Sequence, residues 1–526
     1  MSSNSQLNDT SNDRLSQLHD SRYDELLHVA HEDITITKDL GSVIWNWNLD
    51  SENYGYHQTE TSIHTLEIRN LNQRFTGVQY KGTDAQRSWE KDLKHITDHD
   101  KLRAGSFELY GINQSGTLMI IFHREMIPLN HFYSASLPMN VYISYLTVKE
   151  KCNQTQLWLD VTKGIFCAGP HGPSTSIQEV AIDKTIIPQL PSTQEMLEDS
   201  ACIKFFTQFR SESSSAILDA NILDCARRYP SAKPTHPDLL YPKILEGYEC
   251  DDPQHASRYE RDPLFKRCEM CRVPRDVVAG TRLGLQFDTV YSPSLGSVAR
   301  WPSKEAERLW KWDAQIGLTD ETILGNGLTR FKLSLHVSMG LQVWLQANYG
   351  LQTLLRTWLS QSHRVFGSLK TEPNFESFFV TRAPVVELKF IPKNSLDDVL
   401  KWLRSSASGH QESASSVDKN APPIYLFLRA PPMSIPEFMS WKDGHSHSHF
   451  WSLDENGQTE MSEEESKRWK VPTLHRNGYY ARCEVETCQQ STYASLYDWQ
   501  VARGFDPTTA AFARQCGYPE LDIITE

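Results

Sequence analysis

The sequence lacks the features that usually direct a protein to or through a membrane. The first twenty residues are polar and contain neither the basic start and apolar core of a secretory signal nor the Arg-rich pattern of a transit peptide. No run reaches the roughly 18 consecutive apolar residues that a spanning helix needs. The sequence therefore predicts a soluble, cytoplasmic protein without a membrane span, with a disordered tail at residues 1–20.

Familiar catalytic motifs are missing as well. There is no Gly-x-Ser-x-Gly elbow, no phosphate-binding loop and no dinucleotide fingerprint. The pair Gly325 and Gly327 is too sparse to cradle phosphates and is typical of a turn. The net charge is −13, from 53 basic and 66 acidic residues, with no dense basic block, so nucleic acid is not an expected partner. The sequence identifies no catalytic residues and no cofactor-binding residues.

The ten cysteines are scattered along the chain and, without an export signal, are expected to be reduced thiols. One group differs, because Cys250, His255, Cys268 and Cys271 follow the spacing C-x4-H-x12-C-x2-C in an aliphatic-poor stretch. Four such ligands could close a structural zinc site that orders the loop. The alternative is unrelated cysteines, since only one pair has CxxC spacing. His236 could replace His255 as a ligand.

A second metal hypothesis concerns three histidines that alternate with serine in Gly-His-Ser-His-Ser-His-Phe. On an extended segment His445, His447 and His449 would face one way and could bind a divalent transition metal. The alternative is a polar loop ahead of a short strand at 450–453. Cys483 and Cys488, spaced C-x4-C, could join the histidines, although nothing in the sequence requires it.

The apolar content is sufficient for an ordered protein, with 39% hydrophobic and 10% aromatic residues and 14 tryptophans. A chain of 526 residues should contain several modules. We predict a mixed α+β fold with a β-rich N-terminal part, a central amphipathic helix and a small C-terminal α+β unit. The predicted segments are a tail (1–20), a β-rich then helical region (21–229), a Pro- and charge-rich irregular loop (230–274), a central α+β region (275–404), a flexible linker (405–423) and the C-terminal unit (424–526).

The densest helical pattern spans residues 341–366 and predicts a core helix, within which Gly350 could allow a kink. In the N-terminal part, apolar runs around Asn113-Gln-Ser-Gly predict a hairpin that returns at 118–122, and 140–148 and 157–167 are predicted strands. Ser192 with Glu195 predicts a helix start.

Towards the C-terminus, Ser462 with Glu465 forms a second predicted capping box, which should begin an acidic helix. Asp506, followed directly by a proline, predicts a further helix N-cap. We expect this carboxylate to cap a helix rather than to act as a general base.

The C-terminal sequence resembles a pattern in a family of fungal proteins without established activity. The resemblance is carried by Phe450-Trp-Ser-Leu-Asp, by Arg503-Gly-Phe-Asp-Pro and by Gly517-Tyr-Pro. The chain departs from the pattern at Gln515-Cys-Gly, where leucine is usual, and in its His-rich insertion. The resemblance implies a fungal source and an association with a secondary-metabolite gene cluster, and it supplies no catalytic residues.

Three functional hypotheses remain open from the sequence. The first is an accessory protein that acts by binding a protein or a hydrophobic small molecule. The second is an enzyme of unrecognised type that acts on a hydrophobic small molecule in an aromatic-lined pocket. The third is a zinc-stabilised regulatory protein.

Overall fold

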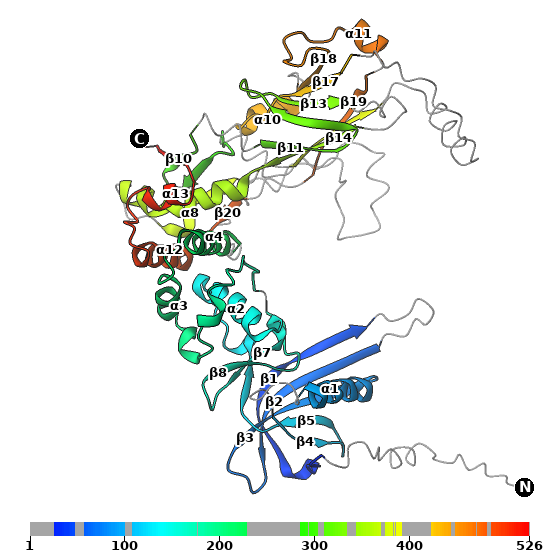
Figure 1. Cartoon of the computed structure of the whole chain (residues 1–526), viewed down its shortest axis with the longest axis vertical. Coiled ribbons are helices and arrows are strands. Elements are labelled where there is room, and N and C mark those ends of the chain that lie inside the picture. Colours follow the sequence, from blue (N-terminus) through cyan, green and yellow to red (C-terminus); the bar gives the residue numbers. More distant parts are fainter. Residues whose placement is uncertain are drawn as a thin grey trace, which may run out of the picture. The chain divides into compact units, whose positions relative to one another are not determined.

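The computed structural model divides the chain into two compact units, Met1–Cys225 and Ala226–Glu526 (Figure 1). The residues it describes are 26–47, 57–99, 108–175, 177–228, 284–292, 294–302, 310–333, 343–369, 374–381, 383, 385–391, 422–442, 448–469, 471–480 and 485–524. The predicted tail (1–20), the predicted irregular loop (230–274) and residues 405–421 of the predicted linker lie outside them. The mixed α+β class with several modules is confirmed.

The N-terminal unit is built on a five-stranded antiparallel sheet in the order β1-β2-β3-β5-β4. Its strands are β1 (Ile34–Trp47), β2 (His57–Ile68), β3 (Arg74–Gly82), β4 (Leu109–Asn113) and β5 (Leu118–Phe122). The hairpin predicted around Asn113 is therefore confirmed as β4 and β5. It forms because two apolar runs flank a short polar turn.

The sheet curls until its two edges are joined by one short segment. Val29 lies beside β4 and donates its backbone N–H to the carbonyl of Ile112 in that strand. The Asp33 carbonyl accepts from the N–H of Arg69, which directly follows β2. The stretch between Val29 and Asp33 spans at most about 14 Å, whereas five strand spacings, from a position beside β4 to the line of β1, total about 24 Å in a flat sheet. The sheet must therefore curl into a small, nearly closed barrel.

Strand alternation gives this barrel two different apolar faces. Helix α1 (Ala85–His99) packs on the outer face, where Trp89 and Leu93 are fully buried. The inner face holds a separate cluster that includes Leu66, Phe75 and Met119. A Cβ atom on Gly77 would lie 2.4 Å from the Leu66 side chain, so the interior is close-packed at that point.

The other described residues of this unit form a three-stranded sheet and three α-helices. The elements are β6 (Met126–Pro128), β7 (Leu157–Asp160), β8 (Ile165–Ala168), α2 (Leu137–Glu150), α3 (Asp199–Phe206) and α4 (Glu212–Arg228), with short 3-10 turns η2 (His31–Asp33), η3 (Leu129–His131), η4 (Gln154–Gln156), η5 (Ile187–Gln189) and η6 (Gln194–Leu197). The strands predicted at 157–167 are confirmed as β7 and β8.

Two local predictions in this unit are wrong. Residues 140–148 form helix α2 rather than a strand, because Ser136 caps the helix by accepting from the Met139 N–H. Residues 137–146 are buried on all sides, so their apolar run has no helical periodicity to distinguish it from a strand. The predicted cap Ser192 instead donates to Glu150, and α3 begins later, at Asp199.

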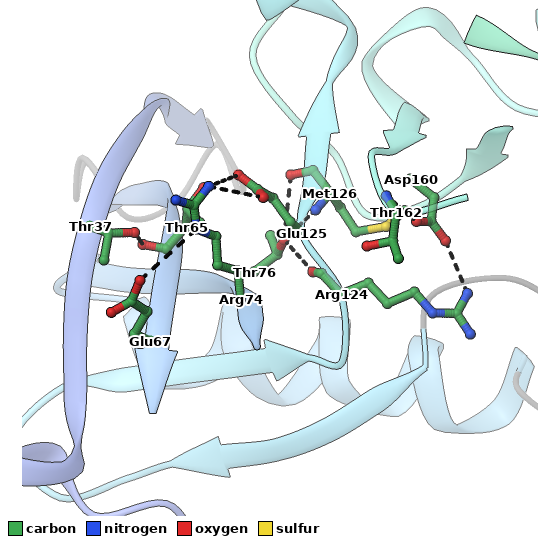
Figure 2. Close-up of polar contacts among 10 residues, drawn as sticks. All are labelled: Thr37, Thr65, Glu67, Arg74, Thr76, Arg124, Glu125, Met126, Asp160 and Thr162. Carbon is green, nitrogen blue, oxygen red and sulfur yellow. Dashed lines mark hydrogen bonds and ion pairs between the residues drawn. The ribbon is translucent and has the colours of Figure 1, made fainter. Parts of the chain in front are cut away.

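A polar network joins the barrel to the three-stranded sheet (Figure 2). The Thr76 hydroxyl accepts from the Met126 N–H at 2.7 Å and donates to the Arg124 carbonyl at 2.8 Å. The Arg124 guanidinium pairs with Asp160 at 3.0 Å, and the same carboxylate accepts from the Thr162 N–H at 3.0 Å. The network fixes β3, the chain after β5 and the end of β7 against one another.

The described residues of the C-terminal unit form three antiparallel sheets. One has the order β20-β15-β9-β10-β21, the second β11-β14-β16-β19 and the third β12-β13-β17-β18. Their bounds are β9 (Thr289–Ser292), β10 (Gly296–Arg300), β11 (Trp310–Ile316), β12 (Leu318–Ile323), β13 (Thr329–Leu333), β14 (Val343–Tyr349), β15 (Phe379–Thr381), β16 (Val385–Ile391), β17 (Tyr425–Leu428), β18 (His449–Ser452), β19 (Thr473–Tyr480), β20 (Val485–Thr487) and β21 (Asp522–Ile523). The two four-stranded sheets share one core, in which Phe390 contacts Trp451.

The separate C-terminal unit predicted for 424–526 is not what the structure shows. Strand β17 pairs with β13, β19 with β16, β20 with β15 and β21 with β10. Each late strand therefore completes a sheet begun before residue 404. Turn and capping signals mark local elements, but they do not reveal which earlier strand completes the hydrogen bonding.

The helix predicted for 341–366 is correct only in its second part. Residues 343–349 form β14, a central strand that pairs with both β11 and β16, and α8 (Leu351–Ser368) begins just after Gly350. A short apolar run is compatible with the periodicity of a helix and with that of a strand. Residues 343–349 adopt the strand because they pair with neighbouring strands on both sides. From Leu351 onward the core prediction holds, because Leu354, Trp358 and Val365 are buried.

The remaining helices of this unit are α10 (Ile435–Lys442), α11 (Glu463–Arg468), α12 (Gln490–Ala502) and α13 (Ala511–Gln515), with a 3-10 turn η9 (Phe375–Ser377). The capping box of Ser462 and Glu465 is confirmed at the start of α11. Asp506 accepts from the Thr508 N–H and so caps a turn, while α13 begins only at Ala511. No helix in the described part of the chain is long and apolar enough to cross a membrane.

Candidate ligand-binding site

Most residues of the two metal hypotheses lie outside the described part of the chain. These are Cys250, His255, Cys268 and Cys271, the substitute ligand His236, and also His445, His447 and Cys483. The zinc hypothesis stays a prediction, and metal analysis of the purified chain tests it. Among the described residues alone, no group of three His, Cys, Asp or Glu side chains is placed to hold a metal ion.

The two described members of the histidine and cysteine group lie in packed surroundings. The His449 ring rests edge-on against Phe390 at 4.9 Å, with its Nδ1 atom 3.1 Å from the Ser448 hydroxyl. Cys488 is buried, and burial raises the pKa of its thiol to about 12. Both side chains therefore contribute to packing in the C-terminal unit.

A nucleophilic role for Cys488 finds no support in its neighbours. Tyr493 hydrogen-bonds to the thiol and also accepts from the Trp358 indole N–H at 3.2 Å. His363 directs Nε2 at the Tyr493 carbonyl, 2.9 Å away, so this nitrogen carries the proton and donates. Burial lowers the pKa of His363, which keeps its ring neutral near pH 7. The histidine holds α8 to α12 and does not activate the thiol.

We predict that Cys488 resists alkylation in the folded protein. A thiol whose pKa is about 12 rather than 9.0 carries about a thousandfold less reactive thiolate at neutral pH. Iodoacetamide labelling followed by peptide mass spectrometry should modify the half-buried Cys152 and Cys516 before Cys488. Cys488 should react only after urea unfolds the chain, and rapid labelling under native conditions would contradict its assigned environment.

The strongest candidate site lies inside the N-terminal barrel. Cross-strand pairing places Ser62, Gln79, Met119 and Asn113 in one row over β2, β3, β5 and β4. Directly paired residues of antiparallel strands project from the same face. Met119 belongs to the inner apolar cluster, so the three polar residues of this row face the interior as well. All four are buried.

His64 occupies the neighbouring row on the same inner face. Its Nε2 atom lies 3.2 Å from the Gln79 amide oxygen, which assigns the ring proton to Nε2. Burial lowers the pKa of His64, against the opposing effects of Asp39 and Gln79, so the ring is neutral near pH 7. The buried Nδ1 atom then presents a lone pair 3.7 Å from an Asp39 carboxylate oxygen, and it makes no hydrogen bond within the protein.

Asn113 is the most unusual residue of the row. Its side chain is 1% exposed, and neither its amide nitrogen nor its amide oxygen has a hydrogen-bond partner. Each buried polar group left without a partner costs about 1–3 kcal/mol. Folded proteins satisfy such groups with ordered water or with a ligand. The carboxamide therefore marks a place where a polar molecule belongs.

Together these side chains offer a defined set of hydrogen-bonding groups. Asn113 supplies a donor beside an acceptor, the His64 ring supplies an acceptor, and Ser62 supplies a hydroxyl. Side chains on the inner face of a small barrel converge towards its axis. The sequence did not reveal this set, because Asn113 was interpreted as part of a hairpin turn and His64 lies in an ordinary strand pattern.

A scan against protein-family models found no match to the chain, and a search of curated proteins found no match either.

Proposed function

We propose that the protein acts by binding a small molecule inside the N-terminal barrel and not by catalysing a reaction. The observation that carries this proposal is the buried Asn113 carboxamide with both of its polar atoms unpartnered. The ligand would present a donor beside an acceptor, as the edge of a lactam or a cis amide does. Such an edge forms two parallel hydrogen bonds with a carboxamide.

The apolar neighbours would add to the strength of this recognition. Met119 lies next to Asn113 in the row, and Leu66 and Ile121 belong to the same inner cluster. Hydrogen bonds in such low-dielectric surroundings are stronger than in water. The His64 Nδ1 lone pair would accept from a further N–H or O–H of the ligand. This neutral acceptor discriminates against a ligand that carries a carboxylate.

The proposal includes a cytoplasmic location and an accessory role. The resemblance of the C-terminal sequence implies a fungal source and a secondary-metabolite gene cluster, where a protein that binds a pathway intermediate would fit. The genes beside the one that encodes this chain test this part of the proposal. A biosynthetic neighbourhood would support it.

The binding proposal is tested with a matched pair of probes, 2-pyrrolidone and cyclopentanone. The two rings have the same size, but only the lactam carries an N–H beside its carbonyl. Saturation-transfer NMR on the full chain should show roughly millimolar binding of 2-pyrrolidone, as its few heavy atoms allow. Cyclopentanone should bind at least about tenfold more weakly, because it leaves the Asn113 oxygen without a donor.

The variant Asn113→Leu has nearly the same shape and removes both orphaned atoms. It should abolish 2-pyrrolidone binding while raising the free energy of unfolding of the free protein by about 1–3 kcal/mol. Gln114→Leu, which changes the half-buried next residue, should leave binding intact. Equal binding of the two probes, or unchanged binding by Asn113→Leu, would refute the proposal.

A further inference from the structure

Strand β1 forms one edge of the N-terminal sheet in the described part of the chain, and its first half is irregular. Five consecutive residues, Thr35–Asp39, are exposed, although side chains of a packed strand alternate between its two faces. We call them the edge stretch. The register with β2 shifts between Ile36 and Lys38 and again between Asp39 and Gly41, where Gly41 has φ +105°. Such bulges bend a strand and redirect its side chains. The edge stretch is therefore packed less firmly than the strands beside it.

The chain is fixed on both sides of the edge stretch. Before it, the Asp33 carbonyl is hydrogen-bonded to the chain that follows β2. After it, the Leu40 side chain is fully buried, and the Leu40 carbonyl accepts from Nε2 of His131. Between these points the strand ladder and the Thr37 hydroxyl, which donates to a β2 carbonyl at 3.1 Å, hold the stretch to β2. The edge stretch can therefore open locally while the rest of the barrel stays folded.

A buried histidine is the cross-strand partner of the last residue in the edge stretch. His64 pairs with Asp39, and its side chain is 9% exposed, whereas that of Asp39 is 72% exposed. The His64 Nδ1 atom lies 3.7 Å from an Asp39 carboxylate oxygen, which also accepts from the Gly41 N–H at 2.9 Å. Lys81 on β3 is the second charged group that acts on the ring. A proton on His64 would therefore sit in a buried position beside a carboxylate that is mostly in water.

This arrangement makes the proton costly as long as the edge stretch is closed. Burial disfavours the charged imidazole, and Asp39 offsets only part of that cost because water screens an exposed carboxylate. Burial accordingly lowers the pKa of His64 in spite of Asp39, and Lys81 acts in the same direction as burial. When the stretch opens, water reaches the ring and its pKa returns towards the ordinary 6.5. The open form then binds the proton more tightly, so acid favours opening.

We propose that His64 is an acid-operated switch that opens the edge stretch of β1. In its neutral state the ring donates from Nε2 to the Gln79 amide oxygen, 3.2 Å away, and the stretch stays closed. Below about pH 6.5 the open form takes up a proton, and its population rises. Opening exposes the inner face of the barrel on the β1 side. The switch operates whether or not the barrel binds a small molecule, so it does not depend on the proposed function.

Hydrogen exchange of the full chain at pH 7.5 and pH 5.0, followed by mass spectrometry of its peptides, measures the switch. After correction for the intrinsic rate, amides of the edge stretch should exchange at least about threefold faster at pH 5.0. The upper limit is about thirtyfold, because the ring of the open form titrates near pH 6.5. Amides of β5, which is paired on both sides, should exchange at the same corrected rate. Unchanged or slower exchange of the edge stretch at pH 5.0 would overturn the proposal.

Two variants should change the switch in opposite directions. His64→Gln cannot titrate and should remove the pH dependence of the edge stretch. Asp39→Asn keeps an oxygen for the Gly41 N–H but loses the charge that favours the protonated closed form. It should therefore lower the pKa of His64 further and increase the acceleration at pH 5.0.

NMR titration of the His64 ring measures its pKa in the free protein, and near-UV circular dichroism checks that each variant is folded. The titration needs no substitution, so it tests the switch even where a variant does not fold. A His64 pKa at or above 6.5 would reject the switch. So would an acceleration that survives in folded His64→Gln, because another group would then be responsible.

Discussion

Replacing Asp160 by alanine is expected to destabilise the N-terminal unit by about 2–3 kcal/mol. The carboxylate is 3% exposed and pairs with the Arg124 guanidinium at 3.0 Å (Figure 2). It also accepts from the backbone N–H groups of Thr162 and Lys163, which it holds in the turn after β7. Its removal leaves these donors without their acceptor. The loss is smaller than for a fully buried pair because Arg124 is 26% exposed and can reach water.

The matched control is Glu67→Ala, which removes an exposed partner of Arg74 in the same region. Exposed ion pairs contribute little, so this variant should change the free energy of unfolding by less than about 0.5 kcal/mol. Urea denaturation followed by circular dichroism measures both variants. An Asp160→Ala protein as stable as the control would show that the network does not hold the two sheets together.

Replacing Gln361 by alanine is expected to produce the second large effect. It should lower the free energy of unfolding of the C-terminal unit by about 2–4 kcal/mol. The Gln361 side chain is fully buried in α8, donates to the Pro519 carbonyl at 2.9 Å and accepts from the Leu521 N–H at 3.0 Å. The side chain therefore hydrogen-bonds one backbone carbonyl and one backbone N–H of a segment distant in sequence, as a neighbouring strand does in a sheet. Alanine leaves the buried Leu521 N–H and the carbonyl of the half-buried Pro519 without these hydrogen bonds.

Gln352→Ala serves as the control, because Gln352 is exposed on the same helix. It should change stability by no more than about 0.5 kcal/mol. Hydrogen exchange measures the local effect. The Leu521 amide should exchange faster in Gln361→Ala than in the unmodified protein, and at an unchanged rate in Gln352→Ala. Unaltered protection of Leu521 would show that Gln361 does not anchor this segment.

Gln361 also shows which features of this helix the sequence can predict and which it cannot. The amphipathic pattern predicts a core helix over 341–366, but a polar side chain such as Gln361 is not part of the apolar pattern that predicts burial. The structure buries it at a point where the backbone leaves helical geometry, with φ −140° and ψ 19°. A buried glutamine is explained only by partners near residue 520. Periodicity reports a side chain's position on its own helix and carries no information on such distant partners.

The distinction between features set by nearby residues and features set by distant partners also applies to the rest of the fold and to the candidate site. Some elements defined by nearby residues were predicted correctly, namely the hairpin around Asn113 and the capping box of Ser462 and Glu465, whereas the cap predicted at Ser192 was not. Strand β14 was not, because its identity depends on pairing with β11 and β16. The row that joins Ser62, Gln79 and Asn113 exists only through the register of four strands. Local patterns do not encode that register.

The pairing of β10 with β21 has a consequence for how the chain folds during synthesis. Ala299 pairs with Ile523, so the first sheet of the C-terminal unit cannot be completed until residue 523 has left the ribosome. The N-terminal unit, whose contacts end at Cys225, can fold long before that. The core of the C-terminal unit that contains Trp310 and Trp312 includes Val471, so these tryptophans stay unpacked until residue 471 has been made. The nascent protein should therefore need chaperone protection mainly in its second half.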